Sequence, residues 1–113
     1  MDLPNANLAI IDRAKLEGYL LSASHPVGRF KARFFARLGF TAADWQLFAQ
    51  ALREQHLAQA AEVGPVDAFG QSFTIRGMLR GPTGAPALVT SVWFVRAGED
   101  RPRFVTAYPG DSR

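Results

Sequence analysis

The sequence predicts an α+β fold, in which about three N-terminal helices are followed by a three- to four-stranded antiparallel sheet. Two observations lead to this prediction. Up to about residue 61 the apolar side chains recur with helical spacing, and from Phe69 onward they alternate with polar ones, as in half-buried strands. Because all the helical segments come before the strand-like ones and the two kinds do not alternate, a doubly wound parallel sheet is disfavoured.

Two helices are expected before residue 40. The first covers residues 13–21, with Asp12 as its N-cap and with Leu16, Tyr19 and Leu20 on its apolar side. The segment 22–26 interrupts it, and Pro26 suits the first position of a second helix, which ends before Gly39. On this second helix, the helical spacing of the apolar residues predicts a buried stripe formed by Val27, Phe30, Phe34 and Leu38.

A third helix is expected from residue 41 to about residue 61. The residues from Thr41 to Asp44 resemble a capping box, with Asp where Glu or Gln is usual. The buried stripe of this helix comprises Trp45, Phe48 and Leu52, and His56 continues it. We therefore interpret His56 as a partly buried, hydrogen-bonded histidine at the edge of the core, in preference to a catalytic one.

Three strands are expected in the second half of the chain. In the first, the buried positions are Phe73, Ile75, Gly77 and Leu79. Residues 87–96 are apolar on both faces and predict a central strand, and residues 103–108 form the last. A weaker signal at residues 61–68 leaves room for a fourth.

The composition is that of a single domain covering residues 1–113. With 48% hydrophobic and 12% aromatic residues, the chain can bury a core and is not disordered. It has no cysteine, which excludes disulfides, cysteine-ligated zinc and a thiol nucleophile. No apolar run has the roughly 18–20 residues of a membrane span, and the first ten residues lack a signal-peptide pattern. We expect a cytoplasmic protein without membrane contacts.

The net charge of +3 is unevenly distributed along the chain. Residues 1–40 carry six Lys or Arg against three Asp or Glu, and residues 71–113 carry the same numbers. The intervening residues 41–70 carry one against four. Basic outer segments are compatible with an anionic partner such as a phosphate backbone, although a charge of this size is common in other proteins.

The start of the second helix is the strongest candidate site. His25 lies where exposed N–H groups and the helix dipole favour an anion, and Lys31 lies at the margin of the apolar stripe. Together they can form a phosphate site. A solvated histidine and a lysine that extends to solvent explain the same residues without any function.

Several other polar side chains can contribute to binding an RNA backbone. Arg29 belongs to an arginine row on the second helix. Thr74, Arg76 and Arg80 share the non-core face of the first strand, and one face of the last strand is expected to carry Phe104, Thr106 and Tyr108. Ordinary surface polarity explains these residues equally well, and Trp93 is expected in the core.

No metal-ligand set and no cofactor motif can be identified. The two histidines are separated by 31 positions among scattered carboxylates, and no phosphate-binding glycine loop is present. RNA cleavage by internal 2′-hydroxyl attack needs neither a metal nor a cofactor, because the substrate supplies its own nucleophile. The protein then supplies only an acid or base and cations for the developing charge.

Several motifs carry a resemblance that covers nearly the whole chain. The most specific is His25-Pro26-Val27-Gly28-x-x-Lys31-Ala32-x-Phe34-Phe35; it is accompanied by Leu3-Pro4-Asn5-Ala6, Lys15-Leu16-x-x-Tyr19-Leu20-Leu21, Leu38-Gly39-Phe40-Thr41 and Val105-Thr106-Ala107-Tyr108-Pro109. The chain resembles a family of small, uncharacterised bacterial domains found alone or at the C-termini of polymorphic and contact-dependent toxins. This family is similar to the barnase–EndoU–colicin–RelE class of metal-independent ribonucleases.

The resemblance implies a toxin-like endoribonuclease that requires no cofactor, with His25, Lys31 and Thr106 as catalytic residues. Arg76 and Arg80 match none of these motifs; together with Arg29 and Tyr108 they are expected to bind the substrate. The expected partners are RNA, with tRNA as one class, and a cognate antitoxin or immunity protein. The alternative is a non-catalytic protein-binding module, or the partner protein of a toxin–antitoxin pair with the same fold.

Overall fold

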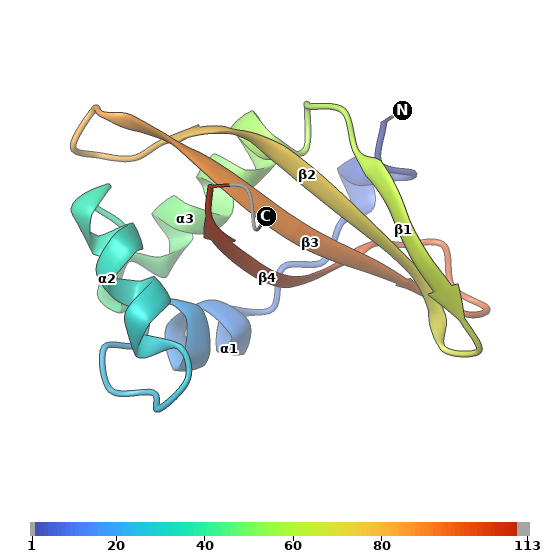
Figure 1. Ribbon diagram of the computed structural model, residues 1–113, viewed down its shortest axis with the longest axis horizontal. Coiled ribbons are helices and arrows are strands. Elements are labelled where there is room, and N and C mark those ends of the chain that lie inside the picture. The colour runs from blue at the N-terminus through green and yellow to red at the C-terminus, as the bar shows by residue number, and fades with distance from the viewer. Residues whose placement is uncertain (1, 111–113) are drawn as a thin grey trace.

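The computed structural model describes residues 2–110, in which helical segments precede a four-stranded antiparallel sheet of order β1-β2-β3-β4 (Figure 1). The strands are β1 (Glu62–Asp67), β2 (Gly70–Arg80), β3 (Pro86–Arg96) and β4 (Arg103–Pro109). The predicted α+β class is confirmed, and the weak signal at residues 61–68 does form a strand.

The helical half is more broken than the sequence suggested. Its α-helices are α1 (Arg13–Lys15), α2 (Arg29–Arg37) and α3 (Trp45–Ala51), and its 3₁₀ turns are η1 (Ala6–Leu8) and η3 (Ala42–Asp44). The helices α1 and α3 widen into π-helical turns, η2 (Leu16–Leu20) and η4 (Leu52–His56). Within residues 2–110, no helix combines the length and apolar character of a membrane span.

Two predicted helix starts can be compared with the structure. The side chain of Asp12 accepts a hydrogen bond from the amide of Ala14 at 2.9 Å, which confirms it as the N-cap of α1. The capping box predicted at Thr41 was wrong, because the Thr41 side chain makes no capping hydrogen bond. A 3₁₀ turn, η3, begins there instead, and α3 follows it.

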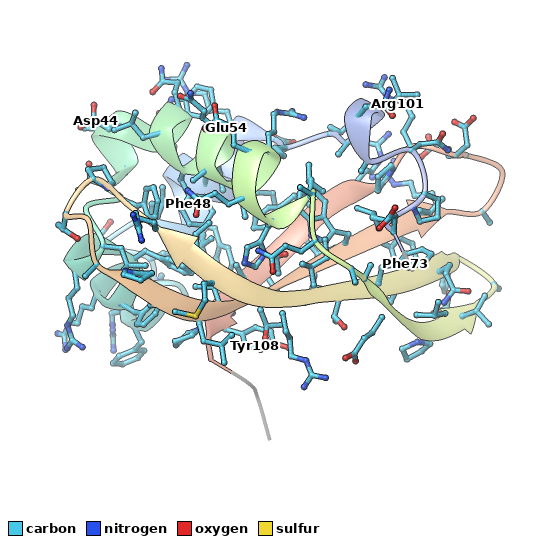
Figure 2. All side chains as sticks on the ribbon, turned by 90° about the horizontal axis from the view of Figure 1, so that it is seen from above. Asp44, Phe48, Glu54, Phe73, Arg101 and Tyr108 are labelled. Carbon is cyan, nitrogen blue, oxygen red and sulfur yellow. The ribbon has the colours of Figure 1, made fainter. Side chains whose placement is uncertain are left out.

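The helices cover one face of the sheet and leave the other open. Figure 2 shows Phe48 of α3 between the helix and the sheet, and Tyr108 of β4 on the opposite side. The alternation predicted for β2 is confirmed, since its odd-numbered positions from 73 to 79 are buried and its even-numbered positions face the open side. Apolar burial of the helix-facing side supplies the main stabilisation of this arrangement.

A β-bulge in β4 changes the expected faces of its side chains. Val92 of β3 pairs with Thr106 and Trp93 pairs with Phe104, so that Val105 is an extra residue. Phe104 therefore lies in the core, only 3% exposed, while Thr106 and Tyr108 lie on the open face. The prediction that all three share a face was wrong, because a bulge breaks the period of two.

The helix α2 is rotated relative to the predicted apolar stripe. Val27 is 65% exposed and Phe30 is 59% exposed, whereas Ala32 and Phe35 are buried. The prediction that Val27 and Phe30 belong to the core was wrong. The rotation brings Lys31, one turn before Phe35 on the same side of the helix, toward the sheet.

The hydrogen bonding predicted for His56 is confirmed at both ring nitrogens, but the ring is fully buried and not partly buried as expected. Trp93 Nε1 donates to Ser91 Oγ at 2.9 Å, and Ser91 Oγ lies 2.8 Å from His56 Nδ1. His56 Nε2 lies 3.1 Å from the carbonyl oxygen of Gly77 and is therefore the protonated nitrogen, since a carbonyl only accepts. Burial lowers the pKa of His56, so the ring is held neutral inside the core.

Candidate functional site

The side chain of Lys31 connects α2 to the edge strand β4. Its Nζ donates to the hydroxyl oxygen of Thr106 at 3.2 Å and to the phenolic oxygen of Tyr19, also at 3.2 Å. The same nitrogen lies 5.5 Å from the ring centre of Tyr19 and 6.0 Å from that of Tyr108. The structure thus brings together two of the predicted catalytic residues, Lys31 and Thr106, with Tyr19 and the predicted substrate-binding residue Tyr108 close to the same ammonium group.

A close helix contact places Lys31 in this position. Gly28 precedes α2 and is buried against η2, where a Cβ atom built on it would clash with the carbonyl oxygen of Tyr19. Only glycine permits this approach of the two segments. The contact fixes the distance between the turn that carries Tyr19 and the helix that carries Lys31.

Tyr19 is a site residue for which the sequence pattern predicted only a place on the apolar side of its helix. It lies in the π-helical turn η2 and is only half-buried, while its neighbours Leu16 and Leu20 are fully buried. The hydrogen bond from Lys31 holds the pKa of Tyr19 below its ordinary value, a further hydrogen bond with Thr106 adds to this, and burial partly opposes it. A phenol beside an ammonium group is more readily ionised than one in water.

His25 lies next to Tyr19, with the two rings edge to face and their centres 5.0 Å apart. Its Nδ1 accepts hydrogen bonds from the amides of Val27 and Gly28, both at 3.0 Å. The sequence predicted that amide groups at the start of this helix would bind an anion. In the structure they donate their hydrogen bonds to the imidazole of His25 instead. Because Nδ1 is an acceptor, the proton of the neutral ring is on Nε2, which remains a donor.

The open face of the sheet continues from this group of residues. Across it, Tyr108 pairs with Thr90 of β3, and Thr90 pairs with Arg76 of β2. Arg76 is therefore two strands, or about 10 Å, from Tyr108, and it forms an ion pair with Glu62 of β1. The predicted substrate-binding residues Tyr108 and Arg76 share one row of this face.

The other two predicted substrate-binding residues lie further away. Arg80 is exposed at the end of β2, four residues or about 13 Å beyond Arg76, and its backbone is bonded to the side chain of Gln55. Arg29 is exposed on α2, with its guanidinium 4.8 Å from the ring centre of Phe30. Among the described residues, neither side chain is hydrogen-bonded to Tyr19 or Thr106.

We call the group formed by Tyr19, His25, Lys31, Thr106 and Tyr108 the Lys31 cluster. All five side chains are partly accessible to solvent. An ammonium group has three N–H donors, and in Lys31 two of them are engaged by the hydroxyl oxygens of Tyr19 and Thr106. The third can bind an anionic oxygen. Within residues 2–110, no group of three or more histidine or carboxylate side chains is arranged to hold a metal ion.

Comparisons with known proteins place the chain among related sequences and folds. A family model described as "Domain of unknown function (DUF6883)" matches residues 2–111. A solved chain from a contact-dependent growth inhibition toxin–immunity protein complex of Klebsiella pneumoniae 342 has a similar fold, with a TM-score of 0.61 and 20% sequence identity. The match covers 95% of this chain and 97% of that chain. No curated protein matches in sequence.

Proposed function

The chain belongs to the DUF6883 family of domains of unknown function, and we propose that it is a toxin-like, metal-independent endoribonuclease that cleaves RNA through attack by the substrate's 2′-hydroxyl. The observation that carries the proposal is the meeting of Lys31, Tyr19 and Thr106 at one point of the open sheet face. The fold likeness to a chain of a toxin–immunity protein complex supports a toxin-related role.

In this reaction the bond from O2′ to phosphorus forms while the bond from phosphorus to O5′ breaks. The free N–H of Lys31 binds a non-bridging oxygen and offsets the negative charge that develops on the phosphoryl group. Tyr19, in its phenolate form, accepts the proton of the 2′-hydroxyl. The departing 5′ oxygen takes its proton from water, which reaches the partly exposed cluster.

The geometry favours a positioning role for His25. A neutral ring with its proton on Nε2 cannot take up another proton there, so Tyr19 is the better candidate for the base. The Nε2–H of His25 is a donor beside the Tyr19 ring and suits a phosphoryl oxygen. Thr106 donates a hydrogen bond to Tyr19 and accepts one from Lys31, and the two bonds hold the phenol and the ammonium group next to each other.

The expected substrate is RNA, with tRNA as one class, bound along the open face. Tyr108 and Arg76 lie on the route that a strand would take from the Lys31 cluster across β3. An immunity protein or antitoxin that inhibits the enzyme would have to cover this face. The inhibitor's surface would be acidic where it meets Lys31 and Arg76.

The experiment that tests the proposal is RNA digestion in EDTA with the wild type and single variants. Total RNA and a purified tRNA pool are incubated with the wild type, Lys31→Met, Tyr19→Phe and the control Arg33→Met, and product ends are identified. We expect 2′,3′-cyclic phosphate ends from the wild type and the control. Rates should fall about 10²- to 10³-fold when Lys31 or Tyr19 is changed. Equal cleavage by all four proteins would mean contamination and a wrong site.

A second candidate function is a non-catalytic protein-binding module, and the edge of the sheet at β1 favours it. Val63 and Val66 on this edge strand are 57% and 70% exposed, and Phe69 in the following turn is 78% exposed. Exposed apolar side chains on an unpaired edge are typical of surfaces that take up a partner strand. A folded wild type that cleaves neither RNA pool, but whose binding to a partner is lost in Val66→Lys, would favour this function.

A further inference from the structure

A cavity of about 300 Å³ lies beside the start of β4, where the N-terminal segment runs along the sheet edge. Its lining includes Ile10, Lys15, Phe94, Arg96, Arg103 and Val105, none of which belongs to the Lys31 cluster. We propose that this cavity is a second nucleotide-binding subsite, which holds the phosphate and base of the RNA residue next to the one bound at the Lys31 cluster. The inference rests on the proposed function.

Two cations in the lining are available for a ligand. Within residues 2–110, Lys15 and Arg96 make neither a side-chain hydrogen bond nor an ion pair, and both are exposed. Arg103 differs, because its guanidinium is bonded to the carboxylate of Glu99 at 3.3 Å and 3.4 Å. Asp12, which also lines the cavity, is engaged by the amide of Ala14. With three cations, Lys15, Arg96 and Arg103, against the one carboxylate of Asp12, the lining carries a net positive charge, which suits a phosphate.

The remaining wall is apolar and includes an aromatic ring. Phe94 lies on the open side of β3 and is only half-buried, and Ile10 and Val105 approach the cavity from the two neighbouring segments. Single-stranded nucleic acids are bound by such pairs of features: cations follow the backbone and aromatic faces stack on the bases. The volume lies at the lower end of the range for ligand pockets, which is suited to one nucleotide.

Two segments of the chain connect the cavity with the Lys31 cluster. On the sheet, Thr106 pairs with Val92 and Arg103 pairs with Phe94, so the cavity begins two residues, or about 7 Å, further along β3. On the helix, Lys15 precedes Tyr19 by one turn, and its charge contributes to lowering the Tyr19 pKa. A strand bound at Lys31 therefore reaches this cavity with its next residue.

The test measures binding separately from cleavage. A fluorescein-labelled pool of random deoxyhexanucleotides lacks the 2′-hydroxyl, so it can be bound but not cut. Its affinity is measured by fluorescence anisotropy at several salt concentrations for the wild type, Lys31→Met, Lys15→Gln and Arg96→Gln. The matched control is Arg13→Gln, since Arg13 lies on α1 two residues before Lys15 but is paired with Glu17 at 2.9 Å.

We expect Lys15→Gln and Arg96→Gln each to weaken binding about 3- to 10-fold and to reduce the slope of log affinity against log salt by about 0.7. The control should retain the wild-type affinity, and all variants should keep the wild-type melting temperature. In the wild type, the oligonucleotide should shift the amide NMR signals of Phe94 and Val105.

Three other results would contradict the second subsite, and they differ in what they mean for the proposed function. If only Lys31→Met weakens binding, the second subsite is wrong and the proposed function stands. If Lys15→Gln and Arg96→Gln weaken binding while Lys31→Met neither binds less nor cleaves less, the proposed active site is wrong, and so is the assignment of the cavity as its neighbour. A folded wild type without affinity for the pool contradicts both proposals.

Discussion

The ammonium nitrogen of Lys31 on α2 lies 3.2 Å from the hydroxyl oxygen of Thr106 on β4, although 75 positions separate the two residues. This hydrogen bond joins a helix to the edge of the sheet at the place where the open face begins. The same nitrogen donates to Tyr19, so one ammonium group organises three segments of the chain. The charge of Lys31 should therefore be detectable in the titration of its neighbours.

Replacing Lys31 by methionine should raise the pKa of Tyr19. The hydrogen bond from Lys31 is the main cause that lowers this pKa, and methionine keeps the length of the side chain without the charge. The chain has two tyrosines, so a Tyr108→Phe background leaves only Tyr19 to be followed by its phenolate absorption. Arg33→Met in the same background should leave the titration unchanged; an equal shift in both would argue against a local effect.

The rate of RNA cleavage should rise with pH as Tyr19 loses its proton. The phenolate is the active form of a base, and the pKa of Tyr19 is lowered from 10.0, so the rise should occur at lower pH than for a free phenol. In Lys31→Met the remaining activity should rise at higher pH. Tyr19→Phe should remove this limb of the profile, and its persistence would assign the base to another group.

His25→Asn and His25→Ala should separate the two contributions of the imidazole. An asparagine side-chain oxygen can still accept the amide hydrogens of Val27 and Gly28, whereas alanine cannot, so only His25→Ala should lose about 1 kcal/mol of stability. Both variants lack the Nε2–H donor and should lose activity to a similar extent. Urea denaturation and cleavage assays measure the two effects, and full activity in His25→Asn would restrict His25 to a structural role.

Gly28→Ala should lower stability by about 1–3 kcal/mol and reduce activity, because the new methyl group meets the carbonyl oxygen of Tyr19. The control is Gly18→Ala in the neighbouring turn, where an added Cβ has no heavy atom within 4 Å. That change should be neutral or stabilise the fold by up to about 1 kcal/mol. Thermal melts of both variants make the comparison, and a stable, active Gly28→Ala would show that the close contact is dispensable.

The buried His56 should make the fold less stable in acid. Its pKa is about 6.5 when the chain is unfolded and lower in the folded state, so below pH 6.5 the unfolded chain binds more protons. The contribution of His56 to the free energy of unfolding should be constant above that pH and should fall as the pH drops toward the folded-state pKa. His56→Gln should cost about 2 kcal/mol at neutral pH and should weaken the pH dependence. Urea titrations of the wild type and His56→Gln at pH 7.5 and 5.5 measure both the loss of stability and its dependence on pH.

The order of elements and much of the core followed from patterns in the sequence. The alternation from Phe73 to Leu79 predicted both the strand and its buried face, and the spacing from Trp45 to Leu52 placed His56 inside. The motif resemblance named Lys31 and Thr106, which the structure brings into contact. Their catalytic roles stay predictions.

Three features depend on contacts between segments and were not visible in the local pattern. The helix α2 packs with Gly28 against Tyr19, and in this orientation Val27 and Phe30 are exposed despite their apolar character. The bulge at Val105 reverses the face of Phe104. Tyr19 was predicted only to lie on the apolar side of its helix. The sequence feature that could have identified it is a tyrosine hydroxyl within the motif Lys15-Leu16-x-x-Tyr19-Leu20-Leu21, in which Leu16 and Leu20 are fully buried.

The Lys31–Thr106 contact also has a consequence for the order in which the protein is made. Synthesis proceeds from the N-terminus at about 5–20 residues per second, so at least several seconds pass between the addition of Lys31 and that of Thr106. Until β4 has left the ribosome, the ammonium group has no strand hydroxyl to bind and the cluster is incomplete. A growing chain therefore carries no assembled site before its last strand has been made and can pair with β3.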